Sequence, residues 1–182
     1  NLIRPSVGAW VSYGLGTENQ GLPGFVTISP PATKGGPRNY SNAFLPTIYQ
    51  GTAIGRAGGE LDAKGIPNLH NSRWSPAAQQ RQLQYLQSLN RLLALDTNSD
   101  QLEATITSVE LAFRMQSSVP ELTDVSDEPQ NVLDMYGAKP GDGSYASNCL
   151  LARRLAERGV RFIQLYHRGW DHHGGLQKFM NI

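Results

Sequence analysis

The chain has 182 residues, enough for one globular domain with a sizeable hydrophobic core. Its 16 basic and 15 acidic residues give a net charge of +1, without the strong basic excess typical of nucleic-acid-binding domains. No apolar stretch reaches the roughly 18 residues of a transmembrane helix, so no membrane span is predicted. The single cysteine, Cys149, excludes an intrachain disulfide and falls in an apolar helical pattern typical of a buried thiol.

The first part of the chain predicts a short helix, a strand and a long loop. Residues 4–14 carry the helix signal, which begins at Pro5 or Ser6 and has an apolar stripe made of Val7, Trp10 and Val11, with Trp10 expected in the core. Residues 25–28 form a short apolar run before two prolines, which indicates a buried strand. Residues 30–74 show no clear periodicity, and a loop of this length usually covers a surface or lines a cleft.

The middle of the chain predicts a helical hairpin over about residues 75–117. Ser75-Pro76 is a strong helix start, and the leucine spacing that follows is helical. Asp100 with Glu103 resembles a capping box for a second helix. The two helices are expected to pack antiparallel. Residues 117–143 are linker-like, with a short helix at about 131–136.

The last part predicts a helix over residues 144–158, a left-handed turn at Gly159 and a strand over 160–166. In this helix Tyr145, Cys149, Ala152 and either Leu155 or Ala156 are expected to face inward. Its arginines, with Arg154 and Arg158 on one face, are expected to be solvated. Helix, glycine and strand make half of a parallel βαβ unit. Only two good strands are predicted, so we expect the chain to be an internal segment of a single larger α/β domain, spanning 1–182 and containing a helix–strand–loop unit at 144–175.

The segment 167–175 is the richest in chemistry, because it holds three histidines and one aspartate directly after the last predicted strand. In open α/β sheets, ligands bind at the carboxyl ends of the strands. Asp171 and His173, two residues apart, could hold one metal ion, for which zinc, manganese or iron suits best. A solvated, histidine-rich loop is the alternative. Arg168 is a candidate for clamping an anionic group, with a surface arginine as the alternative.

Other catalytic patterns are missing from the sequence. It contains no Gly-x-Ser-x-Gly nucleophile turn and no Gly-x-x-x-x-Gly-Lys-Ser/Thr phosphate loop. The pair Gly14 and Gly16 fits a helix end better than a dinucleotide-binding fingerprint. The nucleophile is therefore not identified.

Three stretches resemble the bacterial family known as domain of unknown function 1501, which is placed in the alkaline-phosphatase and sulfatase superfamily. The first is Arg4–Asn19 with Leu22–Val26, and the second is Cys149–Leu155 with Glu157–Phe162. The third is Gly169-Trp170-Asp171-His172-His173-Gly174. The resemblance implies a doubly wound α/β sandwich with a mostly parallel sheet. It also implies a divalent metal such as zinc, manganese or calcium, with Asp171 and His173 as ligands and His172 at a variable position.

The same resemblance implies a metal-dependent hydrolase of phosphate or sulfate esters. Its substrate would be an anionic small molecule or a sulfated or phosphorylated glycan held in part by Arg168. The family's other motifs are not in this chain, so the segment is expected to be inactive alone. Family members often carry an export signal, which implies an exported parent protein. The alternative is a non-catalytic relative that binds glycans or a protein partner.

Overall fold

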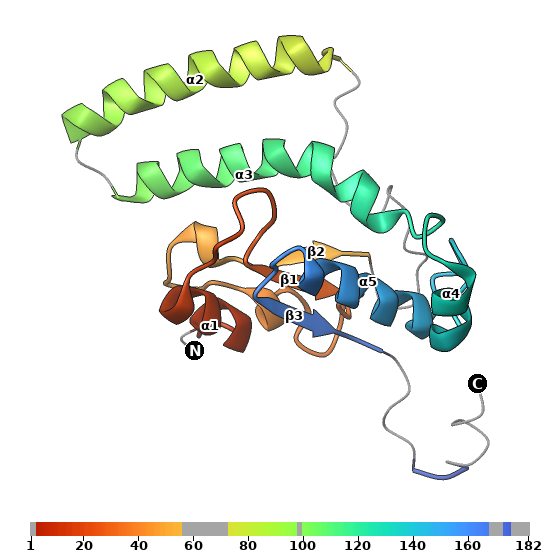
Figure 1. The fold of residues 1–182 in the computed structure, drawn as a ribbon. Helices are drawn as coiled ribbons and strands as arrows, with labels where there is room; N and C mark the ends of the chain where they lie inside the picture. The colour runs from red at the N-terminus through yellow and green to blue at the C-terminus, as the bar shows by residue number, and fades with distance from the viewer. Residues whose placement is uncertain (1–2, 56–72, 98–99, 168–172, 176–182) are drawn as a thin grey trace.

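The computed structural model describes residues 3–55, 73–97, 100–167 and 173–175. A three-stranded parallel sheet lies at its centre, in the order β2-β1-β3 (Figure 1). The strands are β1 (Phe25–Ile28), β2 (Thr52–Ile54) and β3 (Phe162–Leu165). In the register, Val26 of β1 lies beside Thr52 of β2 and beside Ile163 of β3. The prediction of an α/β chain with a parallel sheet is confirmed.

The strand β2 was not predicted, because it lies within the stretch expected to lack regular structure. It has only three residues and follows two short 3-10 helices, η1 (Gly36–Tyr40) and η2 (Thr47–Tyr49). Its extended state depends on pairing with β1, where the backbone N–H of Ser29 donates to the carbonyl of Ile54 at 2.8 Å. Ile54 is buried at the end of the strand. Such a strand is defined by its partner rather than by its own pattern.

The helix α1 (Val7–Leu15) covers one face of the sheet through its small residues. Ser6 caps it by accepting a hydrogen bond from the backbone N–H of Ala9, as the sequence predicts. The buried residues of α1 are Gly8, Ala9 and Ser12, and the ring of Phe25 lies directly against Gly8. The predicted buried stripe was therefore wrong. Val7 is 70% exposed and Trp10 is 46% exposed, because only small residues allow the helix to approach the sheet this closely.

The main hydrophobic core lies on the opposite face of the sheet. It is formed by α3 (Asp100–Thr123) and α5 (Tyr145–Glu157), which pack on the apolar side chains of the strands. The buried core residues are Leu22, Val26, Ile28, Ile54, Met115, Val119, Leu122, Leu151, Leu155 and Val160. Helices on both faces of a parallel sheet are typical of α/β proteins.

The helix α3 runs further than the sequence predicted. The linker was expected from residue 117, yet the helix continues through Pro120 to Thr123. Proline within a helix removes one backbone hydrogen bond. Burial of Val119 and Leu122, which are 1% and 0% exposed, offsets that loss. The short helix α4 (Gln130–Tyr136) follows, close to its predicted position.

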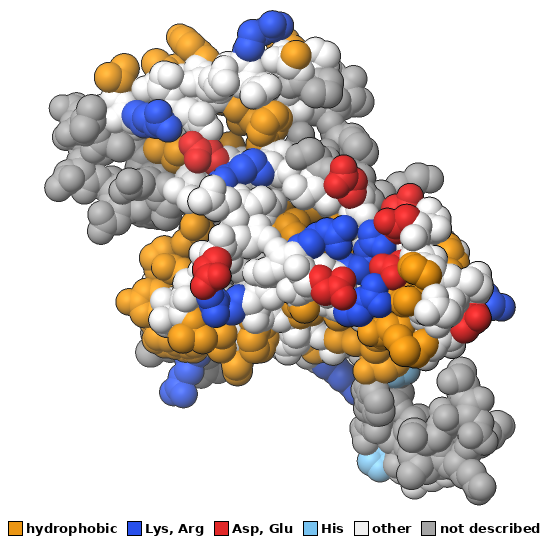
Figure 2. Space-filling view, in the orientation of Figure 1, with side chains coloured by type: hydrophobic (Ala, Val, Ile, Leu, Met, Phe, Trp, Pro, Cys, Tyr) orange, Lys and Arg blue, Asp and Glu red, His pale blue; other side chains and the backbone are white. Residues whose placement is uncertain are grey.

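The prediction of a solvated arginine face is wrong for Arg153 and Arg154, although Arg158 at the end of the helix is exposed. Arg154 is 3% exposed, and its guanidinium donates to Asp127 at 2.7 Å and to Glu128 at 2.8 Å. Arg153 also donates to Glu128. Figure 2 shows basic and acidic side chains intermixed on this side of the molecule. The carboxylates come from the segment between α3 and α4, so the charge pattern of α5 alone cannot show that they are paired.

The inward face of α5 is also rotated from its predicted position. Ser147, Asn148, Leu150, Leu151, Arg154 and Leu155 are its buried residues. Tyr145 is 38% exposed, and Cys149 is only partly buried. Of the other predicted inward residues, Leu155 is fully buried, Ala152 is partly buried and Ala156 is exposed. At the other end, Gly159 adopts a φ of 81°, which confirms the left-handed turn before β3.

Asn19 joins the loop before β1 to the end of α5. Its side-chain oxygen accepts hydrogen bonds from the backbone of Gly21 and Leu22, both at 2.7 Å, and its amide donates to the carbonyl of Arg158. These contacts give the Gly-Thr-Glu-Asn stretch that ends at Asn19 a structural role. They connect the entry of the central strand to the turn that leads into β3.

The predicted helical hairpin is present as α2 (Pro76–Thr97) and α3, which lie side by side and run in opposite directions (Figure 1). The first half of α3 and all of α2 extend beyond the sheet. Among the helices of the described residues, none is long and apolar enough to cross a membrane.

Candidate functional site

The carboxyl edge of the sheet is the candidate site, because three chain segments meet there. The strands β1, β2 and β3 are parallel and end together, and α5 begins at the same edge. The backbone N–H of Tyr166 donates to the carbonyl of Ile28 at 3.0 Å, which holds the end of β3 against the end of β1. Ligands of open parallel sheets bind at this edge.

Ser29, the first residue after β1, has unusual backbone geometry. It has a φ of 52°, in the left-handed region that few residues other than glycine adopt, and it is 4% exposed. Such conformations cost about 1–3 kcal/mol and concentrate at functional sites. Its hydroxyl oxygen accepts a long hydrogen bond of 3.5 Å from the Nδ2 of Asn148. The pair links the end of β1 to the first turns of α5.

Asn148 carries a second unusual feature. It is 5% exposed, yet its Oδ1 has no hydrogen-bond partner within the described part of the chain. Buried polar atoms are nearly always paired, so an unpaired acceptor at the ligand-binding edge of a sheet marks a functional candidate. Strain at Ser29 and an unpaired oxygen on Asn148 therefore coincide at one place.

Tyr145 and His167 lie at the outer rim of this edge. Their ring centroids are 4.7 Å apart and their planes are tilted by 49°. Burial raises the pKa of Tyr145 above its ordinary value, and the neighbouring Cys149 raises it further. Burial also raises the pKa of Tyr166, although the hydrogen bond from Gln164 acts in the opposite direction. These phenols stay protonated at neutral pH and can act only as neutral hydrogen-bonding groups there.

The loop before α5 is organised by Asp142. Its carboxylate accepts from the hydroxyl of Ser147 at 2.5 Å and from the backbone N–H of Ser144 at 2.9 Å. Burial opposes ionisation of this carboxyl, but these hydrogen bonds outweigh it and lower the pKa of Asp142. Gly141 and Gly143 on either side of it have positive φ values of 78° and 60°.

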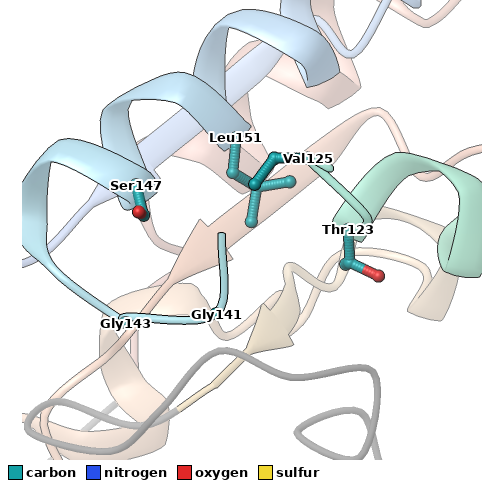
Figure 3. A pocket seen from close by; sticks show the side chains of 6 residues that line it. All are labelled: Thr123, Val125, Gly141, Gly143, Ser147 and Leu151. Carbon is teal, nitrogen blue, oxygen red and sulfur yellow. The ribbon is translucent and has the colours of Figure 1, made fainter. Parts of the chain in front are cut away.

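A small pocket opens between this loop and the end of α3 (Figure 3). Its lining residues are Thr123, Val125, Gly141, Gly143, Ser147 and Leu151. Figure 3 shows Ser147 and Leu151 on α5, with Val125 and Thr123 opposite, close to the carboxyl ends of the strands. The lining is small and mostly apolar, so the pocket itself offers little to bind a charged group.

The site residues predicted from the sequence fall mostly outside the described residues. Arg168 and Asp171 belong to the segment 168–172, whose structure is not described, and so does His172. His173 is described and is exposed. Their expected meeting around one metal therefore stays a prediction. Among the described residues, no group of three or more His, Cys, Asp or Glu side chains lies close enough to hold a metal.

The sequence reasoning missed Ser29, Asn148 and the contact of Tyr145 with His167. No sequence signal predicts a left-handed serine, because glycine or asparagine is the usual residue at such a position. Asn148 was hidden inside a helical pattern that was given the wrong inward face. The position of His167, directly after a parallel strand, was the one available signal for this edge.

The comparisons with known proteins give one family. The family described as "Protein of unknown function (DUF1501)" matches residues 1–181. Neither curated proteins nor solved structures gave a match. A family match across almost the whole chain confirms the family resemblance of its motifs. This chain belongs to the DUF1501 family.

Proposed function

We propose that this chain forms part of a metal-dependent phosphate- or sulfate-ester hydrolase related to the alkaline-phosphatase superfamily. One observation supports it best. The strand β3 pairs in parallel with the central strand β1, and it ends where the segment with Asp171 and His173 begins. That topology makes the segment with the candidate ligands begin at the carboxyl edge, where α/β enzymes hold their ligands.

The donor set suits a divalent metal. Carboxylate oxygen and imidazole nitrogen are ligands of zinc and manganese, and a carboxylate also suits calcium. A bound metal of this kind polarises an ester oxygen and activates a nucleophile. Arg168 would hold an anionic oxygen of the ester, because guanidinium matches such oxygens in a bidentate way. The described part of the chain contributes the carboxyl edge of the sheet at which this segment begins.

The metal content of the protein tests the proposal directly. Purified protein would be dialysed against trace zinc, manganese and calcium and analysed by elemental mass spectrometry. We expect bound metal in the wild type and a loss of it in Asp171→Asn/His173→Ala. His70→Ala is the matched control, since it removes a histidine remote in sequence from the segment. Equal metal content in all three proteins would exclude Asp171 and His173 as ligands.

Activity tests the second half of the proposal. The metal-loaded protein, as this chain and within the longer protein where one exists, would be assayed with p-nitrophenyl phosphate and p-nitrophenyl sulfate. We expect hydrolysis of one ester by the longer protein, lost in Asp171→Asn. Unchanged turnover in that variant would contradict the proposed role.

A second candidate function is binding of a glycan without catalysis, and an exposed aromatic cluster favours it. Trp10 makes edge-to-face contacts with Tyr13 at 5.9 Å and with Phe44 at 5.8 Å, and Tyr13 contacts Tyr49 at 5.3 Å. Trp10, Tyr13 and Phe44 are about half exposed or more, and Figure 2 shows hydrophobic side chains gathered on this part of the surface. Exposed aromatic rings offer flat apolar faces for a sugar.

The two functions make different predictions for a polysaccharide probe. Dextran sulfate and uncharged dextran would be titrated onto the metal-stripped protein by calorimetry. Binding that survives metal removal and is lost in Trp10→Ala favours the glycan-binding function. Absence of binding in the wild type removes this candidate and leaves the hydrolase proposal as it stands.

A further inference from the structure

Asn148 on α5 and Ser29 at the end of β1 form a buried polar pair with unused hydrogen-bonding capacity. They are 5% and 4% exposed, and a long hydrogen bond of 3.5 Å joins the asparagine Nδ2 to the serine Oγ. The Oδ1 of Asn148 is buried and accepts no hydrogen bond from any residue that the structure describes. A buried acceptor without a partner destabilises a fold, so its position at the ligand-binding edge of a sheet points to a ligand.

The pair offers one donor and one acceptor. While Nδ2 donates to Ser29, the Oδ1 of Asn148 can accept and the serine O–H can donate. Rotation of the amide by 180° exchanges these roles, because the serine then donates to Oδ1 and Nδ2 becomes the donor that is left over. In both orientations one donor and one acceptor lie side by side. A single hydroxyl group, which donates and accepts at once, is complementary to this pattern.

The surroundings of the pair favour a neutral ligand. Neither Asn148 nor Ser29 carries a charge, so the pair gives an anion no cation to bind. A divalent cation needs more oxygen ligands than the one acceptor that the pair provides. The small pocket of Figure 3 is adjacent along α5, because Ser147 precedes Asn148 and Leu151 lies one turn further along. Its mostly apolar lining suits the carbon atoms that carry a hydroxyl group.

We propose that Asn148 and Ser29 bind a hydroxyl group of a polyol or sugar, which is the alcohol part of the ester cleaved at this edge. The ester rests on the proposed hydrolase function, whereas the recognition of the hydroxyl rests on the pair itself. The hydroxyl donates to the Oδ1 of Asn148 and accepts from the O–H of Ser29. A ligand without it leaves both buried groups unpaired, which is how a polar site rejects an analogue.

Nuclear magnetic resonance of the full chain tests the binding step without any hydrolysis. The side-chain amide signals of Asn148, assigned by their loss in Asn148→Leu, would be followed while glycerol is added. We expect a saturable shift of these signals with glycerol and none with 1,2,3-trimethoxypropane, in which methyl groups replace the hydroxyl hydrogens. Ser29→Ala should weaken glycerol binding roughly tenfold, because one of the two hydrogen bonds is lost.

Asn131→Leu is the matched control, because Asn131 is an exposed asparagine on α4. It should leave the glycerol affinity unchanged. Asn148→Asp keeps the size of the side chain and gives the same assignment if the leucine variant does not fold. Unshifted Asn148 signals in the wild type, or an equal shift with the trimethyl ether, would overturn the proposal.

Turnover by the longer protein separates this proposal from the hydrolase function. Asn148→Leu should raise the ratio of the KM for glycerol 1-phosphate to the KM for p-nitrophenyl phosphate by roughly tenfold, since the nitrophenol carries no second hydroxyl. An unchanged ratio would contradict the recognition of a hydroxyl group. If the wild type hydrolyses neither ester, the hydrolase function fails, and the glycerol-induced shift still decides whether the pair binds a hydroxyl.

Discussion

The contact between α1 and the sheet can be tested with a single added methyl group. A Cβ at position 8 would lie 2.5–2.6 Å from three ring atoms of Phe25. Carbon atoms in contact are normally about 3.5–4.0 Å apart, so the ring or the helix must move by about 1 Å. Phe25 is 1% exposed and its ring also packs on Phe162, with centroids 5.3 Å apart. A Cβ at Gly51 would meet the same ring at 2.6 Å. The ring therefore has little room to yield.

Two opposing effects determine the result of Gly8→Ala. Replacing glycine by alanine within a helix stabilises the fold by about 0.5–1 kcal/mol. Overpacking a buried contact costs about 1–3 kcal/mol. We expect the steric effect to win and to lower the free energy of unfolding by about 1–2 kcal/mol. Urea denaturation followed by circular dichroism measures this change, with a check that the slope against urea stays constant.

Gly14→Ala is the matched control in the same helix. Nothing lies within 4 Å of a Cβ at Gly14, so this variant should gain the helix propensity without a clash, about 0.5–1 kcal/mol. The double variant Gly8→Ala/Phe25→Leu should lose less than the sum of its single changes, because the smaller side chain makes room for the methyl group. If Gly8→Ala stabilised the protein as Gly14→Ala does, the close approach of α1 to the sheet would be refuted.

Three further predictions concern the buried polar groups on the opposite side of the sheet. Arg154→Met should lower the free energy of unfolding by about 3 kcal/mol, because it leaves the largely buried Glu128 carboxylate with one cation fewer. An equal loss in Arg153→Met, which removes a more exposed arginine, would count against the importance of this burial. The hydrogen bonds from Arg153 and Arg154 lower the pKa of Glu128 below its ordinary value of 4.5. The ionised carboxylate therefore stabilises the fold above pH 4.5, and this stabilisation is lost as the pH falls through the lowered pKa. Acid titration of stability should therefore be less steep in Glu128→Gln below about pH 4.5, and identical profiles would contradict the pairing. Asn148→Leu removes an unpaired buried oxygen together with a long 3.5 Å hydrogen bond to Ser29, and it should raise the free energy of unfolding by about 1 kcal/mol in urea denaturation. A clear loss of stability would show that the bond to Ser29 outweighs the unpaired oxygen.

The candidate site was located only in part by the sequence. The position of His167–Gly175 after a predicted strand pointed to the carboxyl edge, and the strand β3 confirms that this edge is where the segment begins. The strained Ser29 and the unpaired oxygen of Asn148 lie 119 residues apart in the chain. Only the packing of the start of α5 beside the carboxyl end of β1 brings them together, and no local pattern records such a contact.

The sequence by itself determined the elements whose signals are local. The cap at Ser6, the start at Ser75-Pro76, the turn at Gly159 and the apolar run of β1 each depend on residues next to one another, and each prediction was close. Hydrogen bonds within a helix or turn and its own side chains supply the energy of these features. Their positions therefore follow from neighbouring residues.

Only the tertiary structure decided which faces are buried and which charges are paired. The strand β2 forms because β1 supplies its hydrogen-bond partners. The helix α1 buries its glycine and alanine because Phe25 occupies the space that a larger residue would need. Arg154 is buried because Asp127 and Glu128, from a segment distant in the sequence, pair with it. In each case the stabilising energy comes from groups far away in the chain. A periodic pattern identifies an amphipathic element, but the shape and charge of what packs against it select the face that is covered.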